Sequence, residues 1–539
     1  MMHNKPISCQ GCPLYGKGIG YVPDAPVADP DVVILTDQPT YYEERGTAVV
    51  GYTDGVQQLD ECDPAPLLGP VGYQLTHRYF PKLPTTKIAK YSVLKCRWSR
   101  SQELPPPHRL AKAVMHCTAH HLQLPKGRPV IALGELPMWF RLNQVARPEA
   151  ERHVLSDWRG FAINQTFIVG HGSQYFRDPR QREWADRDWE KAGRWLSQTW
   201  PAQVPSRLIV TAQTDERRIY DFFREASTRL LYLDTEFAPH ERLLTLFGCG
   251  YRDATGNLQG LQLRWSDGTI PKSLKAATLS AFRQFLRTNR VAGHNIFGAD
   301  IPILRQNWGI PFDEYGLVDD SMLAHAVVNS DYPHALGFCA SLYSNHNKMK
   351  HLAKESFLEY NWGDVVTGLE TLEACFTAFD HDPSLRSVYE TQSLPVARHL
   401  MVTKWKGIKV NEHRVQTAFD RVDTLVEEID RLADCYCPGL NLDSPKQLMS
   451  LLYAREQLPI QKGPNRQPCM TAEAMQTLRE WWCEANGLDL PDTTTETWSL
   501  DDVFARIKEG EHPILICLTA HNYHDDKTRK YLKQLVIPE

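Results

Sequence analysis

The sequence has no long hydrophobic run. None of its apolar stretches approaches the ~20 residues that a membrane-spanning helix requires, although the chain has 539 residues. The first residues, MMHNKPISCQGC, contain no apolar segment of the type that secretory signals carry. Internal repeats and low-complexity segments are also absent from the sequence. We therefore expect a cytoplasmic protein that neither crosses a membrane nor is secreted.

A strong bias in composition is absent as well. Hydrophobic residues make up 42% of the chain and charged residues 23%, which is ordinary for a globular protein and excludes a disordered or fibrous one. At about 150 residues per domain, the length predicts three or four domains. The net charge is −5, but residues 78–128 contain eleven basic residues and one acidic residue. This local surplus of positive charge is compatible with contacts to phosphates.

The order of apolar runs predicts a multidomain α/β protein. Short runs of strand length, such as DVVILT at 31–36 and PVIAL at 129–133, alternate with helical stretches in the first part of the chain. This alternation favours a central parallel sheet. Two prolines in TWPAQVPSR, at 199–207, mark a first boundary, and HDP at 381–383 precedes a largely helical region. The predicted domains are 1–200, 207–382 and 383–539.

Thirteen cysteines without a secretory signal favour free thiols or metal ligation over disulfides. Cys9 and Cys12 form a CxxC motif in a loop, and Cys96 and Cys117 follow far along the chain. Thiolates from a loop and two distant segments can form a tetrahedral zinc site or an iron–sulfur cluster. The spacing does not choose between these metals, and Cys96 and Cys117 are also compatible with simple buried thiols.

Seven short motifs give residues 5–198 a resemblance to family 4 uracil-DNA glycosylases. They occur in the order of that family: CQGCPLYGKG (9–18), DVVILTDQP (31–39), PLLGPVG (66–72), YSVLKCRW (91–98), Cys117, VIALGE (130–135) and VGHGS (169–173). The resemblance implies a glycosylase-like α/β domain. It also implies that Cys9, Cys12, Cys96 and Cys117 hold a [4Fe-4S] cluster.

The segments that would form the uracil pocket depart from the family's pattern. A Gly-Glu-Ala-Pro-Gly type of turn is replaced by Thr36-Asp37-Gln38-Pro39-Thr40, and His-Pro-Ser is replaced by His171-Gly172-Ser173. His171 can donate a hydrogen bond to a departing base and Asp37 can order a water molecule. An insertion at about 47–65 separates the two halves of the pocket. The pocket candidates are Asp37, Gln38, His171 and Ser173, and both excision and binding without excision stay open.

Four carboxylates in the middle of the chain form the sharpest chemical pattern. Asp234 and Glu236 lie two residues apart at the end of the predicted strand LLYLDTEF, so both project to the same face. Asp300 begins a predicted helix, and Tyr360 precedes Asp364 by four residues, which is one helical turn. Carboxylates from three segments can bind two divalent cations, Mg²⁺ or Mn²⁺. A tyrosine one turn away can orient a water molecule.

In this order and spacing, the five residues resemble the DEDD-Y 3′–5′ exonuclease domain of family A DNA polymerases. The resemblance implies a ribonuclease H-like fold. It implies that Asp234, Glu236, Asp300 and Asp364 bind two metal ions and that Tyr360 positions the attacking water. Glu370 and Glu373 lie near Asp364 in the sequence, but no tyrosine stands four residues before either of them.

The C-terminal region resembles the thumb of the same polymerases. The similar segments are LRSVYETQSLPVARHLMVTKWKGIKVN (385–411), NLDSPKQLMSLLY (441–453), MTAEAMQTL (470–478) and HPILICLTAHNYHDDKTRKYLKQL (512–535). Nothing in the sequence resembles the palm motifs Asp-Tyr-Ser-Gln-Ile-Glu or His-Asp-Glu, and we interpret His524-Asp525-Asp526 as surface charge. Nucleotide polymerisation needs two palm aspartates that hold Mg²⁺. We therefore expect no polymerase activity from this chain alone.

Three hypotheses follow from these patterns. The first is the exonuclease half of a split, phage-type family A DNA polymerase, acting in the host cytoplasm on single-stranded 3′ ends and primer-template DNA. A second chain would then carry the palm and fingers. The second hypothesis is a stand-alone repair enzyme that combines glycosylase and exonuclease activities. The third is a replication protein whose first domain senses uracil without cutting.

Overall fold

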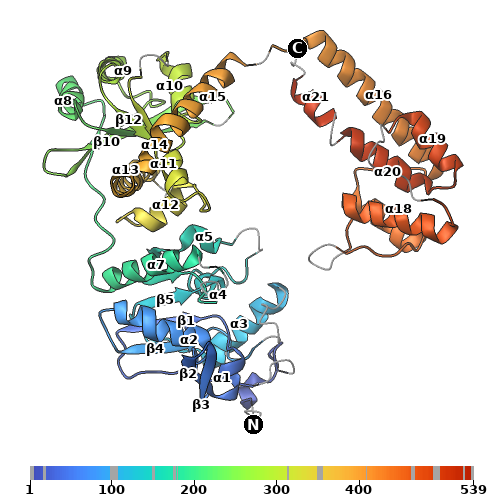
Figure 1. Cartoon of the computed structure of the whole chain (residues 1–539), viewed down its shortest axis with the longest axis horizontal. Helices are drawn as coiled ribbons and strands as arrows, with labels where there is room; N and C mark the ends of the chain where they lie inside the picture. Colours follow the sequence, from blue (N-terminus) through green and yellow to red (C-terminus); the bar gives the residue numbers. More distant parts are fainter. Residues whose placement is uncertain are drawn as a thin grey trace. The chain divides into compact units, whose positions relative to one another are not determined.

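Contacts divide the chain into two compact units, Met1–Trp405 and Lys406–Glu539. The computed structural model describes residues 5–15, 20–97, 107–147, 152–173, 178, 180–238, 240–311, 315–348, 356–407, 409–462, 468–489, 498–525 and 529–535. In the described residues, the first unit contains a five-stranded sheet, a six-stranded sheet and a two-stranded hairpin, and the second unit is built from helices (Figure 1). None of the described helices is long and apolar enough to cross a membrane.

The first sheet has five strands in the order β4-β1-β5-β7-β6. β1, β4, β5 and β7 run parallel, and β6 pairs antiparallel with β7 at the edge. Every residue of β1, β5 and β7 is buried, as expected for a parallel sheet that is covered on both faces. The strands are β1 (Val32–Thr36), β4 (Ile88–Ser92), β5 (Val130–Leu133), β6 (Phe161–Ile163) and β7 (Thr166–Val169).

Alternate residues of β1 face different helices. Val33 and Leu35 pack with α3 and α4, whereas Val32 and Ile34 pack with α7. The insertion that the sequence places at about 47–65 forms the largely exposed hairpin β2–β3. The other elements around this sheet are α1 (Tyr41–Arg45), β2 (Thr47–Thr53), β3 (Val56–Glu61), α2 (Pro70–Gln74), α3 (Pro107–His121), α4 (Glu135–Arg141), α5 (Leu155–Trp158) and α7 (Arg180–Leu196).

The second sheet is mixed, with six strands in the order β13-β12-β9-β10-β11-β8. β9, β10 and β11 form antiparallel pairs, and β12 runs parallel to both β9 and β13. β8 pairs parallel with β11 at the other edge. The strands are β8 (Leu208–Ile209), β9 (Leu231–Ala238), β10 (Leu243–Arg252), β11 (Leu258–Arg264), β12 (Val291–Gly293) and β13 (Val318–Asp320).

Helices cover both faces of the second sheet. Leu231 and Leu233 of β9 pack with α8, α9 and α10, whereas Tyr232 packs with α11 and α13 on the opposite face. These helices are α8 (Glu216–Ala226), α9 (Lys272–Leu286), α10 (Asp300–Trp308), α11 (Ser321–Val328), α12 (Leu336–Tyr343) and α13 (Phe357–His381). The predicted mixed α/β architecture is therefore present.

Glycines allow α13 to lie very close to the second sheet. A Cβ atom on Gly260 of β11 would lie 2.1 Å from the Trp362 ring, and one on Gly248 of β10 would lie 2.1 Å from Asn361. On the helix itself, a Cβ at Gly368 would lie 2.2 Å from the Tyr232 hydroxyl. Atoms in well-packed interiors do not approach so closely. The absence of three side chains thus sets how near α13 comes to the sheet.

Buried polar contacts join the first sheet to α12. Arg159 donates to the Asp188 carboxylate at 2.5 Å and to the Ser341 hydroxyl at 2.7 Å. Lys191 donates to the Ser341 carbonyl at 2.6 Å, and the Asn347 amide bonds both backbone groups of Ala162 on the edge strand β6. Burial raises the pKa of Asp188 to about 6 and lowers that of Lys191 to about 7. The elements around the two sheets are thus packed together within the first unit.

Residues after the expected boundary at 383 belong to the first unit. α14 (Pro383–Val388) and α15 (Leu394–Lys406) follow α13 after a break at Asp382, whose side chain caps α14. The Tyr389 hydroxyl accepts a hydrogen bond from the Asp320 amide at 2.8 Å, and Met401 is buried in the core of the second sheet. The sequence marks the local break correctly, but long-range packing holds the following helices against the same sheet.

The second unit packs its helices around one apolar core. Its longest helix, α16, begins after Asn411, and α17 begins after Ser444, whose side chain accepts a hydrogen bond from the Gln447 amide. Pro445 occupies the first turn of α17, where its missing amide hydrogen costs no intrahelical bond. The helices are α16 (Glu412–Tyr436), α17 (Pro445–Met449), α18 (Ala472–Asn486), α19 (Leu500–Lys508), α20 (Pro513–His524) and α21 (Lys530–Leu535).

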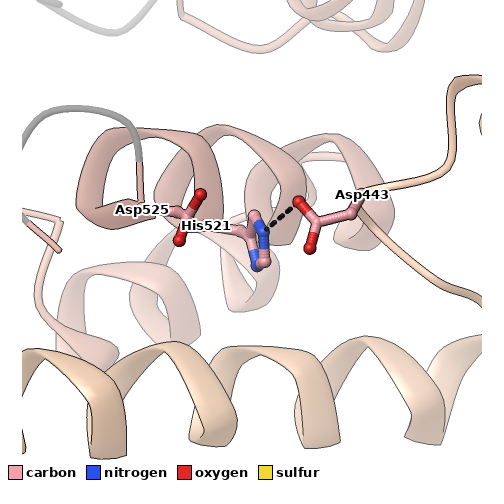
Figure 2. Close-up of side chains that lie close together, drawn as sticks. All are labelled: Asp443, His521 and Asp525. Atoms are coloured by element: carbon pink, nitrogen blue, oxygen red, sulfur yellow. Dashed lines mark hydrogen bonds and ion pairs between the residues drawn. The ribbon is translucent and has the colours of Figure 1, made fainter. Parts of the chain in front are cut away.

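A buried histidine links α20 to the rest of the second unit. His521 Nδ1 lies 2.8 Å from the Asp430 carboxylate of α16, and Nε2 lies 3.3 Å from the Asp443 carboxylate (Figure 2). Asp525 follows on the same chain segment and pairs with Arg529 and Lys530.

The neighbouring His524 is also buried, and its Nε2 bonds the Trp498 carbonyl. The interpretation of His524 as surface charge is therefore wrong, because packing against the 498 segment removes it from solvent. Asp525 is partly buried, and Asp526 lies outside the described residues.

We expect the stability of the second unit to fall as the pH rises through the raised pKa of His521. Burial alone lowers the pKa of His521, but hydrogen bonds and charges from Asp430 and Asp443 outweigh it and raise the pKa. A histidine with a raised folded pKa stabilises the fold below its unfolded pKa of ~6.5 and loses that contribution as the pH passes the folded pKa. Hydrogen exchange of the α20 amides, corrected for intrinsic rates, measures this loss. His521→Gln, which cannot titrate, should remove the pH dependence; an unchanged profile in that variant would contradict the assignment.

Candidate functional site

Three carboxylates meet where α13 crosses the second sheet. Asp234 and Glu236 lie two residues apart on β9, so their side chains project to the same face of the sheet. This face also carries Tyr232 and is covered by α13. Asp364 lies on α13 itself. One oxygen from each of Asp234, Glu236 and Asp364 lies within 4.8 Å of the other two. The structure therefore brings these three predicted residues together.

Asp300 joins this group from the first turn of α10. Its carboxylate is buried and accepts hydrogen bonds from the Thr235 amide at 2.8 Å and the Thr235 hydroxyl at 2.7 Å. Thr235 lies between Asp234 and Glu236, so these bonds fix Asp300 beside both. Burial and the charge of Asp234 raise the pKa of Asp300 well above its ordinary value.

Tyr360 lies one helical turn before Asp364 on α13. Its hydroxyl is close enough to the Asp364 carboxylate to hydrogen-bond with it. Burial, followed by the charges of Asp364 and Glu236, raises the pKa of Tyr360. The hydroxyl is therefore protonated at neutral pH and can donate. A cavity of about 130 Å³ lies beside Tyr360 and Asp364, and its wall includes Phe161 of β6.

Burial dominates the electrostatics of the site, and repulsion between the carboxylates adds to it at Glu236 and Asp300. Burial and the charges of Asp234, Asp364 and Asp300 raise the pKa of Glu236 to about 9. Burial raises the pKa of Asp234 to about 6, against a lowering contribution from a hydrogen bond with Asn361. Mg²⁺ and Mn²⁺ take oxygen ligands, so the donor set of this site fits either cation. A bound cation would favour the charged carboxylates and would offset the repulsion that contributes to the raised pKa of Glu236.

The sequence analysis missed Asn361. Its amide donates to the Asp234 carboxylate at 2.6 Å, and its side chain is fully buried. A signal was available, because a polar residue next to Trp362 in a buried helix needs a partner. Glu370 and Glu373 lie elsewhere: Glu370 accepts from the Ser344 hydroxyl and Glu373 pairs with Arg252.

The four predicted cluster cysteines are all buried, and each lies near enough to others of the group to affect their pKa values. Cys9 ends the short 3-10 helix Ile7–Cys9, Cys12 follows it, Cys96 follows β4 and Cys117 lies on α3. The thiols of Cys12 and Cys117 are within hydrogen-bonding reach, which lowers the pKa of Cys12 to about 6. Burial, and to a smaller extent the charges of Cys9 and Cys12, raise the pKa of Cys96 to about 12. The four thiols are thus available to bind one metal ion or cluster.

The spacing of these thiols bears on which group they fit. Among the described residues, no three of the four sulfur atoms lie within 4.8 Å of one another. The four sulfur ligands of zinc, at ~2.3 Å from the metal, would lie ~3.8 Å apart. The thiols of Cys12 and Cys117 are nevertheless in hydrogen-bond contact, so the spacing does not choose between zinc and an iron–sulfur cluster. His121, which the sequence analysis did not consider, places Nε2 3.3 Å from the Cys9 sulfur.

Three of the four uracil-pocket candidates also meet. Asp37 follows β1 and His171 follows β7, so both lie at the carboxyl edge of the first sheet, where ligands bind in open α/β sheets. His171 Nε2 lies 3.4 Å from the Asp37 carboxylate. His171 Nδ1 lies 2.6 Å from the Ser173 hydroxyl and accepts from the Ser173 amide at 3.2 Å. Gln38 is buried beside Asp37 in the sequence.

This arrangement determines the chemistry that His171 and Asp37 can offer. Since Nδ1 of His171 accepts a hydrogen bond, Nε2 carries the proton that faces Asp37. Burial and the charge of Glu135 raise the pKa of Asp37 to about 8. A cavity of about 100 Å³ lies next to the same loop, and Arg78, Gly172 and Arg182 contribute to its wall.

No protein-family model matches the sequence, and no curated protein matches it. Similar solved structures include the POL domain of Pol1 from M. smegmatis in complex with DNA primer-template and dNTP, with a TM-score of 0.38 and 17% identity over 61% of this chain. The present chain spans about half the length of this POL domain (50%). The EXD2 exonuclease domain soaked in Mg and GMP has a TM-score of 0.17 and 18% identity, over 34% of this chain and 93% of that one. At these values neither likeness assigns a family or a function.

Proposed function

We propose that the first unit carries a divalent-cation-dependent 3′–5′ exonuclease that acts on DNA. The observation that supports this most directly is the convergence of Asp234, Glu236 and Asp364 within 4.8 Å. Asp300 and Tyr360 border the same group. Partly buried carboxylates that repel one another are unfavourable in isolation, and strongly perturbed acidic groups of this kind cluster at functional sites.

Each residue has a defined task in this proposal. Asp234, Glu236 and Asp364 would hold one cation, and Asp234 and Asp300 would hold a second. When bound, the cations polarise the phosphate and lower the pKa of a bound water molecule. The protonated hydroxyl of Tyr360, held beside Asp364, would orient the attacking water. The hydrogen bonds from Thr235 keep Asp300 in place, so its position does not depend on the substrate.

The exonuclease is, in this proposal, the proofreading half of a split DNA polymerase. The second unit is helical, as expected for a thumb, and the sequence carries no palm motif. A palm and fingers would then lie outside these 539 residues, and the sequence analysis assigns them to a second chain. The basic surplus at 78–128 suits a protein that follows a DNA backbone.

We expect the protein to shorten 5′-labelled single-stranded DNA stepwise from its 3′ end in Mg²⁺ and to be inactive in EDTA. Asp234→Ala removes a ligand that serves both cation positions. Because metal polarisation contributes several kcal/mol, this variant should lose roughly 100-fold or more of the rate. Denaturing gels of a time course measure the ladder. Tyr360→Phe, which keeps the ring, should lose less.

Thr371→Val is the matched control for this assay. Thr371 is a buried residue of the same helix whose hydroxyl bonds the Thr367 carbonyl, away from the carboxylates. This variant should keep the wild-type rate. Immediate release of the labelled 5′ nucleotide, or a ladder that persists in Asp234→Ala, would overturn the assignment.

We further propose that Cys9, Cys12, Cys96 and Cys117 hold a [4Fe-4S] cluster. Their burial and the contact between the Cys12 and Cys117 thiols support this. Protein purified without oxygen should contain about four iron atoms per chain. Cys96→Ser should lose most of this iron, whereas Cys62→Ser, at an exposed cysteine, should retain it. Elemental analysis measures both metals, and about one zinc per chain without iron would contradict the proposal.

The first domain is, in our proposal, a uracil-binding domain. The hydrogen-bonded group of Asp37, His171 and Ser173 at the edge of the first sheet favours this second function. Uracil lacks the methyl group of thymine, and a pocket discriminates such a difference by roughly 10-fold or more. In EDTA, fluorescence anisotropy should therefore show tighter binding of a strand with one uracil than of its thymine counterpart. His171→Ala should remove the preference, and His381→Ala, at an exposed histidine, should not.

Alkali treatment of the same uracil strand separates the remaining alternatives. A break at uracil after incubation in EDTA would show excision and favour the repair enzyme. A uracil preference without a break would favour a sensor. Equal affinity for both strands would contradict uracil binding.

A further inference from the structure

The side chain of Asn361 hydrogen-bonds two groups of Asp234, its carboxylate and its main-chain carbonyl. Its Nδ2 donates to the Asp234 carboxylate at 2.6 Å and to the Asp234 main-chain carbonyl at 3.1 Å. The Asn361 side chain has no solvent exposure. Water therefore cannot replace it as a donor without a change in packing. Asn361 thus fixes both the backbone position and one carboxylate oxygen of Asp234.

A second buried amide holds Asn361 from behind. Gln262 of β11 donates to Asn361 Oδ1 at 2.8 Å and accepts from Arg207 at 2.7 Å. Arg207 in turn pairs with Glu359 on the first turn of α13. The guanidinium only donates and the ionised Asp234 only accepts, so the orientation of both amides between them is fixed. The chain of hydrogen bonds has one possible direction.

The strands beneath Asn361 leave room for this chain of hydrogen bonds. Gly248 of β10 lies directly opposite Asp234 in the ladder between β9 and β10. A Cβ atom at Gly248 would lie 2.1 Å from Asn361 Oδ1. Any side chain at this position would displace the amide. Asn361 therefore sits over the Asp234–Gly248 pair because glycine occupies the opposite strand.

We propose that Asn361, supported by Gln262 and Arg207, is a positioning residue that orients the Asp234 carboxylate for cation binding. The inference rests on the exonuclease site proposed above. The Asn361 amide holds one oxygen of Asp234, and an oxygen of this carboxylate lies within 4.8 Å of those of Glu236 and Asp364. Without the amide, repulsion from Glu236, Asp300 and Asp364 would turn Asp234 away. Removal of a residue that orients a metal ligand in this way commonly weakens metal binding by roughly 10- to 100-fold.

Binding of Mn²⁺ to the full chain tests this without reference to catalysis. Free Mn²⁺ is measured by electron paramagnetic resonance, and the signal of Asp234→Asn is subtracted to isolate this site. Asn361→Leu keeps a similar volume and removes the donor, and it should weaken Mn²⁺ binding roughly 10- to 100-fold. Gln262→Met removes only the support for Asn361 and should weaken binding roughly two- to tenfold. Thr371→Val should bind as the wild type does.

Kinetics distinguish positioning from a general loss of structure. For Asn361→Leu we expect a higher Mg²⁺ concentration at half-maximal rate, with most of kcat recovered at saturating Mg²⁺. A structural role would lower kcat at every Mg²⁺ concentration and would lower the melting temperature well beyond that of Thr371→Val. Gln262→Met keeps the test valid if Asn361→Leu does not fold.

The outcomes separate this inference from the proposed exonuclease. If Asn361→Leu and Gln262→Met fold and bind Mn²⁺ as tightly as the wild type while the wild type degrades DNA, the positioning role is overturned and the exonuclease stands. If both variants weaken Mn²⁺ binding but the wild type degrades no DNA, the positioning role stands and the exonuclease is overturned.

Discussion

The close approach of α13 to the second sheet is the constraint on which the candidate nuclease site depends. Gly248 and Gly260 on neighbouring strands admit Asn361 and Trp362, and Gly368 admits Tyr232. With the helix at this depth, Asp364 reaches the carboxylates of β9. A larger side chain at any of the three glycines would push the helix outward. The three glycines therefore determine how close Asp364 of α13 comes to the carboxylates of β9.

The same close packing makes the site electrostatically unfavourable without a cation. Asp300 is buried and Asp234 is partly buried, and the pKa of Glu236 rises because of burial and the charges of three other carboxylates. Folding then forces these groups to take up protons near neutral pH or to repel one another. Such a site reduces the stability of the fold in exchange for function. Donors such as Asn361 and Thr235 offset part of this cost by hydrogen-bonding the charged forms.

Local patterns predicted the parts of the structure that local rules control. The spacing of two residues put Asp234 and Glu236 on one face, and the apolar run at 31–36 became a buried parallel strand. Asn361 was not predicted because its partner, Asp234, lies 127 residues away in the sequence. Helix and strand periodicity gives no information about contacts at that separation. The region around 383 shows the same limit: α13 ends at His381, but Tyr389 packs against Asp320, and the two compact units divide after Trp405. The catalytic roles of the site residues stay predictions.

A buried carboxylate connects the two sheets of the first unit. Asp188 is paired with Arg159, which also bonds Ser341 on α12, and the Gly170 amide next to His171 stabilises the same carboxylate. Buried ion pairs contribute little net stability, because desolvation offsets their attraction, but the loss of one partner is costly. Their geometric demands are strict, however. The loop that carries His171 and α12 beside the nuclease cavity thus both contact this buried ion pair, and Lys191 adds a further bond to α12.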